Sequence, residues 1–222
     1  NAINGMEVRR GAVTTIQPIT RTWASTDIVY VVTGYLTYGI DVTLVIQPVV
    51  KVKVLPNRLI DIQGALKVQG TTDDPVYFTS MKDDSVGGDT NNDGNNSAPA
   101  PGDWGHINFA DSSDDSLSLV EHAILRYGGY HTDYGGGGPC GGNDWYYFYP
   151  GACRTIWYNG IIRLAAAAPT LSNNTITRNN RGIEILGSSN PQLGCNDISA
   201  NDSVGIRNDT PANVIIAKNQ WW

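Results

Sequence analysis

The residues best suited to chemistry in this sequence form one acidic segment, residues 89–95, which reads Asp-Thr-Asn-Asn-Asp-Gly-Asn. Asp89, Asn91 and Asp93 place side-chain oxygens at its first, third and fifth positions, and a glycine follows at the sixth. Loops wrap oxygen ligands around Ca²⁺ with this spacing, and Asn95 at the seventh position has a backbone carbonyl to offer. The sequence therefore predicts a structural calcium site in this segment.

The segment is not an EF-hand, because position twelve, which would require glutamate, is Ala100. A carboxylate from outside the segment must complete the shell. Asp103 is the best candidate, and Asp84 or Asp83 could approach from the other side. The alternative is a solvated acidic loop that binds no ion.

A second candidate site is a glycine-rich and aromatic segment, residues 128–155. Exposed tyrosine and tryptophan rings are typical of surfaces that stack on sugars or contact a partner protein. The alternative is that the rings fold back over the side of the protein. The candidate ligand-binding residues are Tyr130, Tyr134, Trp145, Tyr146, Tyr147 and Tyr149.

The same segment contains Cys140 and Cys153, which flank twelve residues. A disulfide between them is plausible in an oxidising compartment and would stabilise the fold by about 3 kcal/mol. The alternative is two free thiols. The third cysteine, Cys195, is expected to be a buried core thiol.

Five carboxylates between residues 103 and 121 lie close in sequence, and a glycosidase needs two at a defined separation. Those at 111–115 resemble a Ser/Asp turn, and no basic residues cluster with the proposed calcium loop. The three histidines do not share metal-ligand spacing, and His122 is expected to be half-buried and structural. We therefore assign no catalytic residue from the sequence.

The elements that position these residues repeat every 22 residues near the C-terminus. Two consecutive rows, 159–180 and 181–202, each hold short apolar runs separated by glycine, proline and asparagine. Such runs are typical of strands, and a period of this length is the signature of a solenoid. The matched pairs are Gly160 and Gly182, Pro169 and Pro191, Leu171 and Leu193, Asn174 and Asn196, and Ile176 and Ile198.

The rest of the chain fits the same architecture. Short β-branched runs between residues 28 and 79 predict further turns, and residues 1–27 are expected to form an N-terminal cap or a lead-in to the first turn. The period fails at residues 81–103 and 128–155, which we expect to be lateral loops. We predict one all-β domain over 1–222, a parallel β-helix with about 22 residues per turn and eight or nine turns. The aligned asparagines, at 174 and 196 and at 179 and 201, are expected to form ladders at its corners.

Composition limits the function. The net charge is −6, and without a basic run the chain lacks a nucleic-acid footprint. No stretch approaches the roughly 20 apolar residues of a membrane-spanning helix. The chain begins at Asn1 without methionine, so we expect either a removed signal peptide or a fragment of a longer protein.

Several stretches resemble bacterial secreted right-handed parallel β-helix repeat proteins, and together they cover most of the chain from about Arg21. They are residues 30–34, 42–50, 64–80, 88–94, 101–105, 119–129 and 218–222. The resemblance implies a right-handed single-stranded parallel β-helix and a secreted, extracellular or cell-surface location. Because this family includes adhesin-like surface proteins, filament components and polysaccharide-active enzymes, the resemblance leaves the activity open.

We expect an extracellular structural or adhesive module, stabilised by calcium, that binds glycan or cell-surface protein partners or self-associates through its solenoid ends into a surface structure or filament. The alternative is a polysaccharide lyase or glycoside hydrolase on the same fold.

Overall fold

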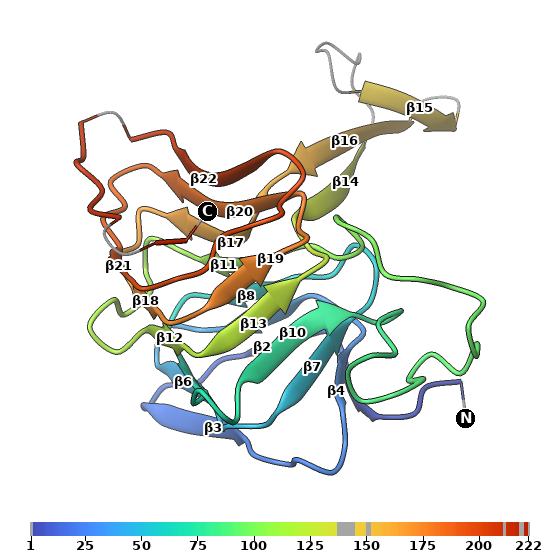
Figure 1. Ribbon diagram of the computed structural model, residues 1–222. Helices are drawn as coiled ribbons and strands as arrows, with labels where there is room; N and C mark the ends of the chain where they lie inside the picture. Colours follow the sequence, from blue (N-terminus) through green and yellow to red (C-terminus); the bar gives the residue numbers. More distant parts are fainter. Residues whose placement is uncertain (1, 137–144, 150–151, 211, 218–219, 222) are drawn as a thin grey trace.

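The computed structural model describes residues 2–136, 145–149, 152–210, 212–217 and 220–221, and between 131 and 158 it describes the backbone alone. The described chain is all-β and winds into a parallel β-helix with three parallel sheets, which confirms the predicted fold class (Figure 1). None of the described residues forms a helix long and apolar enough to cross a membrane.

Each of the three sheets collects one strand from every turn of the chain. Sheet A contains β1 (Met6–Val8), β4 (Tyr30–Val32), β7 (Lys51–Val54), β10 (Val76–Ser80), β13 (Ala123–Arg126) and β19 (Thr175–Thr177). Sheet B contains β2 (Gly11–Val13), β5 (Leu36–Tyr38), β8 (Ile60–Ile62), β11 (Ile107–Phe109), β17 (Gly160–Ala165), β20 (Arg181–Leu186) and β22 (Val204–Asn208). Sheet C contains β3 (Ile19–Trp23), β6 (Val42–Ile46), β9 (Ala65–Gln69), β12 (Leu119–Glu121), β18 (Thr170–Ser172) and β21 (Gln192–Gly194).

The described residues form fewer turns than the eight or nine that we predicted. Sheets A and C have six strands each and sheet B has seven, so there are six complete turns and the start of another. The prediction was wrong because the connections from β10 to β11 and from β13 to β17 use long stretches of chain without adding a turn. The N-terminal residues do not form a separate cap, because β1, β2 and β3 are themselves the first turn.

The core is built from columns of aliphatic side chains that stack from turn to turn. In sheet B, Ile60, Ile107, Ile162 and Ile183 lie in register and are at most 1% exposed. Strand side chains alternate between the two faces, so every second residue points into the helix and meets its equivalent above and below. Stacking of equal side chains therefore holds neighbouring turns in register.

The pairing of β17 with β20 differs by one residue from the sequence match. Ile162 pairs with Ile183, an offset of 21, whereas Leu171 pairs with Leu193 in sheet C at the expected offset of 22. A slip of one residue exchanges the two faces of a strand. A uniform offset of 22 would place the charged Glu184 beside the buried Ile162. The offset instead changes from 21 to 22 in the turn after β20, which contains Gly187 with φ +64°.

The predicted asparagine ladders are present at two corners. Asn196 Oδ1 accepts hydrogen bonds from the backbone N–H and the Nδ2 of Asn174 at 3.0 and 2.9 Å. Asn179 and Asn201 repeat the arrangement at the next corner. The left-handed conformation at these corners falls on the residues just before the ladder asparagines, such as Asn173 and Cys195, which have positive φ.

Cys195 is exposed, not buried as predicted. Its position is the left-handed corner residue, with φ +53°, immediately before the buried Asn196. The conformation of the corner turns the asparagine inward and the cysteine outward. The prediction of a buried thiol rested on the place of Cys195 beside Leu193 in the repeat, which does not show how the corner orients the two side chains.

The aromatic segment is not a simple loop. Its described parts form an antiparallel sheet in the order β14 (Tyr130–Gly136), β16 (Ala152–Tyr158) and β15 (Trp145–Tyr149). Figure 1 shows this small sheet beside the upper end of the stack, extending away from the three parallel sheets.

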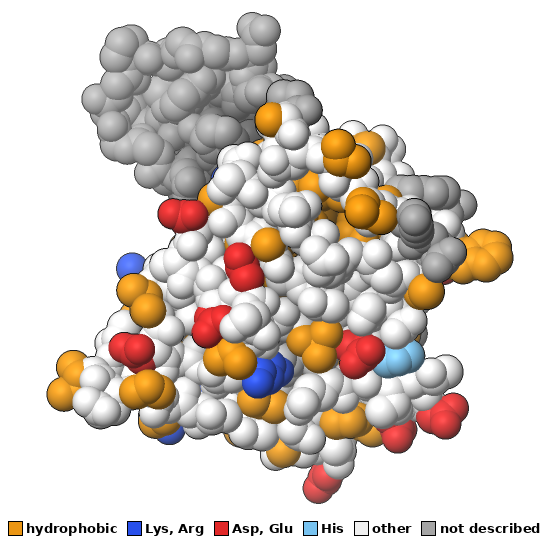
Figure 2. All heavy atoms as spheres, turned by 90° about the vertical axis from the view of Figure 1, so that its left-hand side faces the viewer, with side chains coloured by type: hydrophobic (Ala, Val, Ile, Leu, Met, Phe, Trp, Pro, Cys, Tyr) orange, Lys and Arg blue, Asp and Glu red, His pale blue; other side chains and the backbone are white. Residues whose placement is uncertain are grey.

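The face on the left of Figure 1 mixes hydrophobic and polar side chains (Figure 2). Its hydrophobic side chains are scattered over the whole height of the face. In the last described part of the chain, the exposed apolar residues are Val214, Ile216 and Trp221, which are 84%, 61% and 74% exposed.

Candidate cation site

The loop of residues 81–103, called the acidic loop below, covers the outer face of sheet A. Val31, Lys53 and Thr79 lie in register on three neighbouring strands and point away from the core, yet each is 0% exposed. Outward positions of a solenoid normally face water, so their burial requires a cover. The loop supplies that cover, with Met81 packed against Val29 and Val31.

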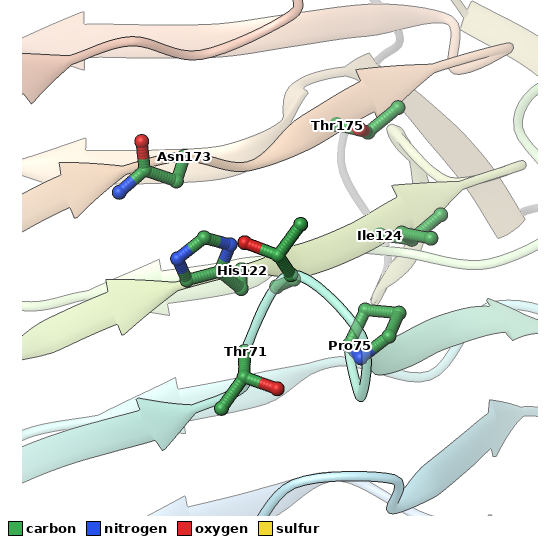
Figure 3. Close-up of a pocket in the computed structure, with 8 residues that line it drawn as sticks. Thr71, Pro75, His122, Ile124, Asn173 and Thr175 are labelled. Atoms are coloured by element: carbon green, nitrogen blue, oxygen red, sulfur yellow. The ribbon is translucent and has the colours of Figure 1, made fainter.

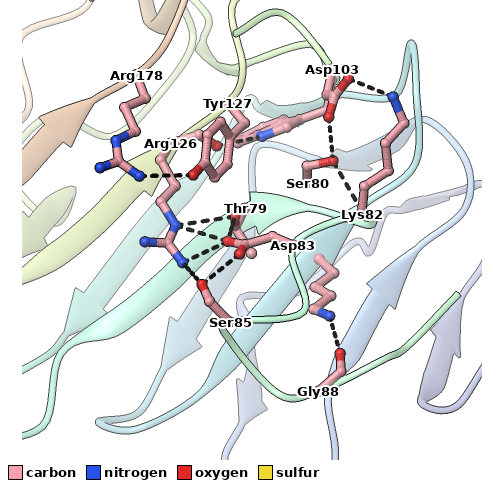
Figure 4. Close-up of polar contacts among 12 residues, drawn as sticks. Thr79, Ser80, Lys82, Asp83, Ser85, Gly88, Asp103, Arg126, Tyr127 and Arg178 are labelled. Atoms are coloured by element: carbon pink, nitrogen blue, oxygen red, sulfur yellow. Dashed lines mark hydrogen bonds and ion pairs between the residues drawn. The ribbon is translucent and has the colours of Figure 1, made fainter. Parts of the chain in front are cut away.

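The acidic loop is fastened at its start by a buried ion pair between Asp83 and Arg126 of β13, at 2.7 Å (Figure 4). Thr79 and Ser85 also donate hydrogen bonds to the Asp83 carboxylate. Burial alone would raise the pKa of Asp83, but the Ser85 and Thr79 hydrogen bonds and the charge of Arg126 hold it below its usual value. Asp83 therefore anchors the loop. Of the two neighbouring aspartates, Asp84 remains as the candidate cation ligand.

The loop is fastened at its other end by Asp103 and Trp104. Asp103 accepts hydrogen bonds from Ser80 at 2.7 Å and Ala100 N–H at 3.0 Å, and it pairs with Lys82 at 2.8 Å. Trp104 is fully buried and donates its indole N–H to the Arg126 carbonyl. Asp103, the first sequence candidate for closing the calcium shell, thus holds the base of the loop.

Between these anchors, the loop brings Asp84, Asp89 and Asp93 together. One carboxylate oxygen from each lies within 4.8 Å of the other two. Asp89 is held by the backbone N–H groups of Asp93 at 3.1 Å and Gly94 at 2.9 Å. Positive φ angles at Asn92 and Gly94 fold the chain back over Asp89, as the glycine at position six predicts.

Three oxygens of this cluster are buried without a hydrogen-bond donor. They are Asp84 Oδ1, Asn91 Oδ1 and Asp93 Oδ1. The other Asp93 oxygen is occupied, because it accepts from Asn91 Nδ2 at 2.8 Å and from Ser97 at 2.5 Å. An unsatisfied buried acceptor costs about 1–3 kcal/mol, and more when it is charged. The arrangement therefore offers oxygen ligands that a metal ion could satisfy.

The electrostatics agree with this geometry. Burial raises the pKa of Asp84, and the neighbouring charges of Asp89 and Asp93 act in the same direction, opposed by Lys53. Three carboxylates this close repel one another unless a cation lies between them. Of the six predicted ligands, the structure brings together Asp84, Asp89, Asn91 and Asp93, whereas Asp103 is engaged at the base of the loop. The contribution of the Asn95 backbone carbonyl stays a prediction.

The other predicted sites lie largely outside the described part of the chain. Tyr130 is half-buried at the start of β14. The side chains of Tyr134, Trp145, Tyr146, Tyr147 and Tyr149 are outside the described residues, as is the predicted Cys140–Cys153 pair. The aromatic ligand site and the disulfide stay predictions.

The remaining carboxylates near residue 115 serve local structure. Hydrogen bonds from Ser116 and the Leu117 N–H lower the pKa of exposed Asp114. Asp115 accepts from the Ala168 N–H at 2.8 Å, and Glu121 accepts from Ser172 at 3.3 Å. They hold turns and neighbouring strands, and nothing in these contacts pairs two of them for acid–base chemistry.

Sequence reasoning missed an open pocket of about 200 Å³ at the corner between sheets C and A (Figure 3). His122, half-buried as predicted, faces it with Thr71 and Pro75 from the turn before β10. The φ of His122 is +48°, so the residue lies in a left-handed corner. No periodicity in the sequence marks this corner as a cavity.

A charged cluster on the outer face of sheet B was also missed. Glu184 is 5% exposed and lies 3.6–3.9 Å from Arg163, Arg181 and Arg207. Burial raises the pKa of Glu184, and the three arginines oppose the shift. The sequence does contain a pattern that indicates this cluster: the equivalent outward positions of three successive turns are Arg163, Glu184 and Arg207.

Comparison with known proteins supports the fold. A family model described as "right handed beta helix region" matches residues 152–221. No curated protein and no solved structure gave a significant match to the chain.

Proposed function

We propose that the chain is an extracellular, non-enzymatic structural module in which Ca²⁺ pins the acidic loop to sheet A. The proposed ligands are Asp84, Asp89, Asn91 and Asp93. One observation carries the proposal: three oxygens of this set are buried and lack a hydrogen-bond donor.

The chemistry of the ligands favours calcium among common cations. All are carboxylate or amide oxygens, which suit hard cations. Ca²⁺ accepts six to eight oxygens in a flexible geometry, so backbone carbonyls and water can complete the shell, whereas Mg²⁺ requires a near-ideal octahedron. An irregular loop held at both ends fits the more tolerant ion.

The structural role follows from what the loop covers. It buries Lys53 and Thr79 and packs Met81 over the outer face of sheet A. It also holds the first strand, because the backbone N–H of Asn4 donates to the Thr90 carbonyl at 2.8 Å and its side chain donates to the Asp89 carbonyl at 3.1 Å. An ion that orders Asp89 would therefore stabilise the N-terminal turn as well.

The test is calcium binding by isothermal titration calorimetry, paired with thermal melting in excess Ca²⁺ and in EDTA. At 100 times the dissociation constant, binding adds about 2.7 kcal/mol, which corresponds to a rise in Tm of about 5–10 °C for a protein of this size. Asp93→Asn should abolish both signals. Asp111→Asn, a matched change at an exposed aspartate outside the loop, should leave both intact. A wild-type Tm that EDTA does not change would rule out the structural calcium site.

We extend the proposal to surface partners, glycan or protein, at the aromatic segment. Its support is the projecting antiparallel sheet, whose backbone carries the predicted tyrosines and tryptophan away from the stack (Figure 1). Deleting residues 132–156 should abolish binding on a glycan array while leaving the Ca²⁺-dependent melting unchanged. Equal binding by the deletion variant would contradict this part of the proposal.

A further inference from the structure

The pocket at the corner between sheets C and A exists because one connection is longer than those stacked on it. Residues 70–75 join β9 to β10, whereas His122 alone joins β12 to β13 in the next turn. The longer connection therefore projects and forms a shelf beneath His122 and, one turn further, Asn173 (Figure 3). The space above this shelf is the open pocket of about 200 Å³.

The walls of the pocket are held in place by the protein's own hydrogen bonds. The Asp74 N–H donates to Thr71 Oγ1 at 3.0 Å, and the Thr71 N–H donates to the Asp74 carbonyl at 3.1 Å, so the projecting connection is closed on itself. The Val76 N–H donates to the His122 carbonyl at 3.1 Å, which ties this connection to the corner above it. A pocket with ordered walls loses little conformational entropy when a ligand binds.

The lining combines polar groups with apolar surface. Hydroxyl, imidazole and amide groups come from Thr72, His122, Asn173 and Thr175, and apolar surface comes from Pro75 and Ile124. Within the described part of the chain, no residue forms a hydrogen bond with the side chain of Thr72, His122 or Thr175. These groups are therefore available to a ligand.

The charges around the pocket argue against an ionic ligand. Among the described residues that line it, none has a carboxylate, ammonium or guanidinium group. The residues that adjoin the lining in sequence include Asp73, Asp74 and Glu121, so an anionic ligand would meet like charges. The pocket suits a neutral ligand.

The strands beside the pocket offer no edge to a peptide. β10, β13 and β19 already pair with one another in sheet A. A ligand must therefore be recognised by side chains and not by strand addition. A sugar ring meets this requirement, because its hydroxyl groups can bond to the polar lining while its C–H groups pack on Pro75 and Ile124.

We propose that this corner pocket binds one neutral pyranose ring of a glycan. Its volume is below the roughly 300–1,000 Å³ that is typical of pockets for drug-sized ligands. A single ring suits this size, and the rest of the glycan chain extends through the open mouth. The pocket shares no residue with the proposed calcium site or with the aromatic segment, so the proposal is independent of both.

The test is an NMR titration of the full chain in excess Ca²⁺, in which backbone amide shifts locate the binding. The probes are neutral trisaccharides of glucose, galactose and mannose, with trigalacturonate as the acidic counterpart. Thr175→Val removes a hydroxyl at nearly constant shape, and His122→Gly removes the ring at a left-handed position that glycine accepts. Thr177→Val is the matched control, because Thr177 also points outward from β19 but does not line the pocket.

At least one neutral trisaccharide should shift the amides of residues 71–72, 122–124 and 173–175. An open pocket for one ring should bind weakly, with a dissociation constant of about 1 mM. Thr175→Val and His122→Gly should each weaken binding by about fivefold, through the loss of a hydrogen bond. Thr177→Val should bind like the wild type, and trigalacturonate should bind more weakly than the neutral sugar.

Three results would overturn the inference. They are shifts confined to other parts of the chain, the aromatic segment included, binding by Thr175→Val that equals that of the wild type, and no response to any neutral trisaccharide at millimolar concentration. Tighter binding of trigalacturonate would overturn the assignment to a neutral sugar. Calcium titrations of the same protein report on the acidic loop separately, so failure of the pocket is distinguishable from failure of the proposed calcium site.

Discussion

At the residue scale, Asp83 and Asp84 are neighbours with opposite electrostatic situations. Asp83 is 2% exposed and neutralised by Arg126, and its pKa is lowered. Asp84 has a buried oxygen without a donor, and its pKa is raised. One carboxylate anchors the loop directly, and the other is a ligand of the proposed cation.

The Asp83–Arg126 pair predicts an acid-dependent loss of stability. Because the folded pKa of Asp83 is below its unfolded value of about 3.9, its contribution is present above that pH and is lost as pH falls through the folded pKa. Asp83→Asn should lower the free energy of unfolding at pH 7 by about 3 kcal/mol, since it leaves Arg126 without its partner. Urea melts at pH 7 and at pH 2–3 measure both effects. The deficit of the variant should shrink in acid, and a deficit that is constant with pH would contradict the assignment.

The neighbouring substitution, Asp84→Asn, should behave differently. In EDTA, where no cation is bound, the substitution removes a carboxylate whose pKa is raised in the folded protein. Ionising such a carboxylate destabilises the folded state, and this destabilisation develops as pH rises from the unfolded pKa through the folded pKa. We expect its Tm in EDTA at pH 7 to equal or exceed that of the wild type, and the rise on adding Ca²⁺ to be lost. A Tm below that of the wild type in EDTA would show that Asp84 holds the loop without an ion.

At the element scale, the turns are joined by stacked apolar columns inside and asparagine ladders at the corners. A backbone group at a corner cannot pair within a sheet, and a buried unpaired group is costly. Asn174 meets this need by donating from Nδ2 to the Val120 carbonyl and accepting from the Ala123 N–H, each at 2.9 Å. The corner hydrogen bonds thus continue the ladder between the sheets.

The ladder predicts a large effect from one amide. Asn196→Ala removes the acceptor for Asn174 and the donor to the Leu171 carbonyl, all buried. We expect a loss of about 2–4 kcal/mol in the free energy of unfolding, from two or more unsatisfied buried groups. Gln192→Ala, an exposed amide in β21 of the same turn, should change it by less than about 0.5 kcal/mol. Equal losses in chemical denaturation would argue against the ladder as a source of stability.

At the scale of the whole molecule, exposed apolar side chains lie in the last described part of the chain, at Val214, Ile216 and Trp221. Exposed apolar patches often mark surfaces that contact another protein. We propose that this surface contributes to self-association.

Self-association should depend on concentration and on this surface. We expect sedimentation velocity to detect dimers or longer stacks at high protein concentration, and Ile216→Asp to reduce them. Ile40→Asp is the matched control, because Ile40 is 68% exposed but lies at a corner between β5 and β6. A protein that stays monomeric at high concentration would contradict the prediction.

The sequence alone determined the repeating architecture, because every turn requires the same kinds of residue at equivalent positions. Aliphatic residues recur at positions that stack, and asparagines recur at corners whose backbone groups need partners, so the period reveals the elements. It also identified Asp89, Asn91 and Asp93, since their spacing is local to one short loop.

Only the tertiary structure decided which distant groups join them. The path of the acidic loop brings in Asp84, commits Asp83 to Arg126 and Asp103 to Lys82, and buries Lys53, whose outward position on β7 would otherwise face water. Likewise, the 21-residue register of β17 with β20 follows from packing of Ile162 on Ile183, not from the matched glycines. These choices depend on contacts between residues far apart in the chain, and no local pattern encodes them.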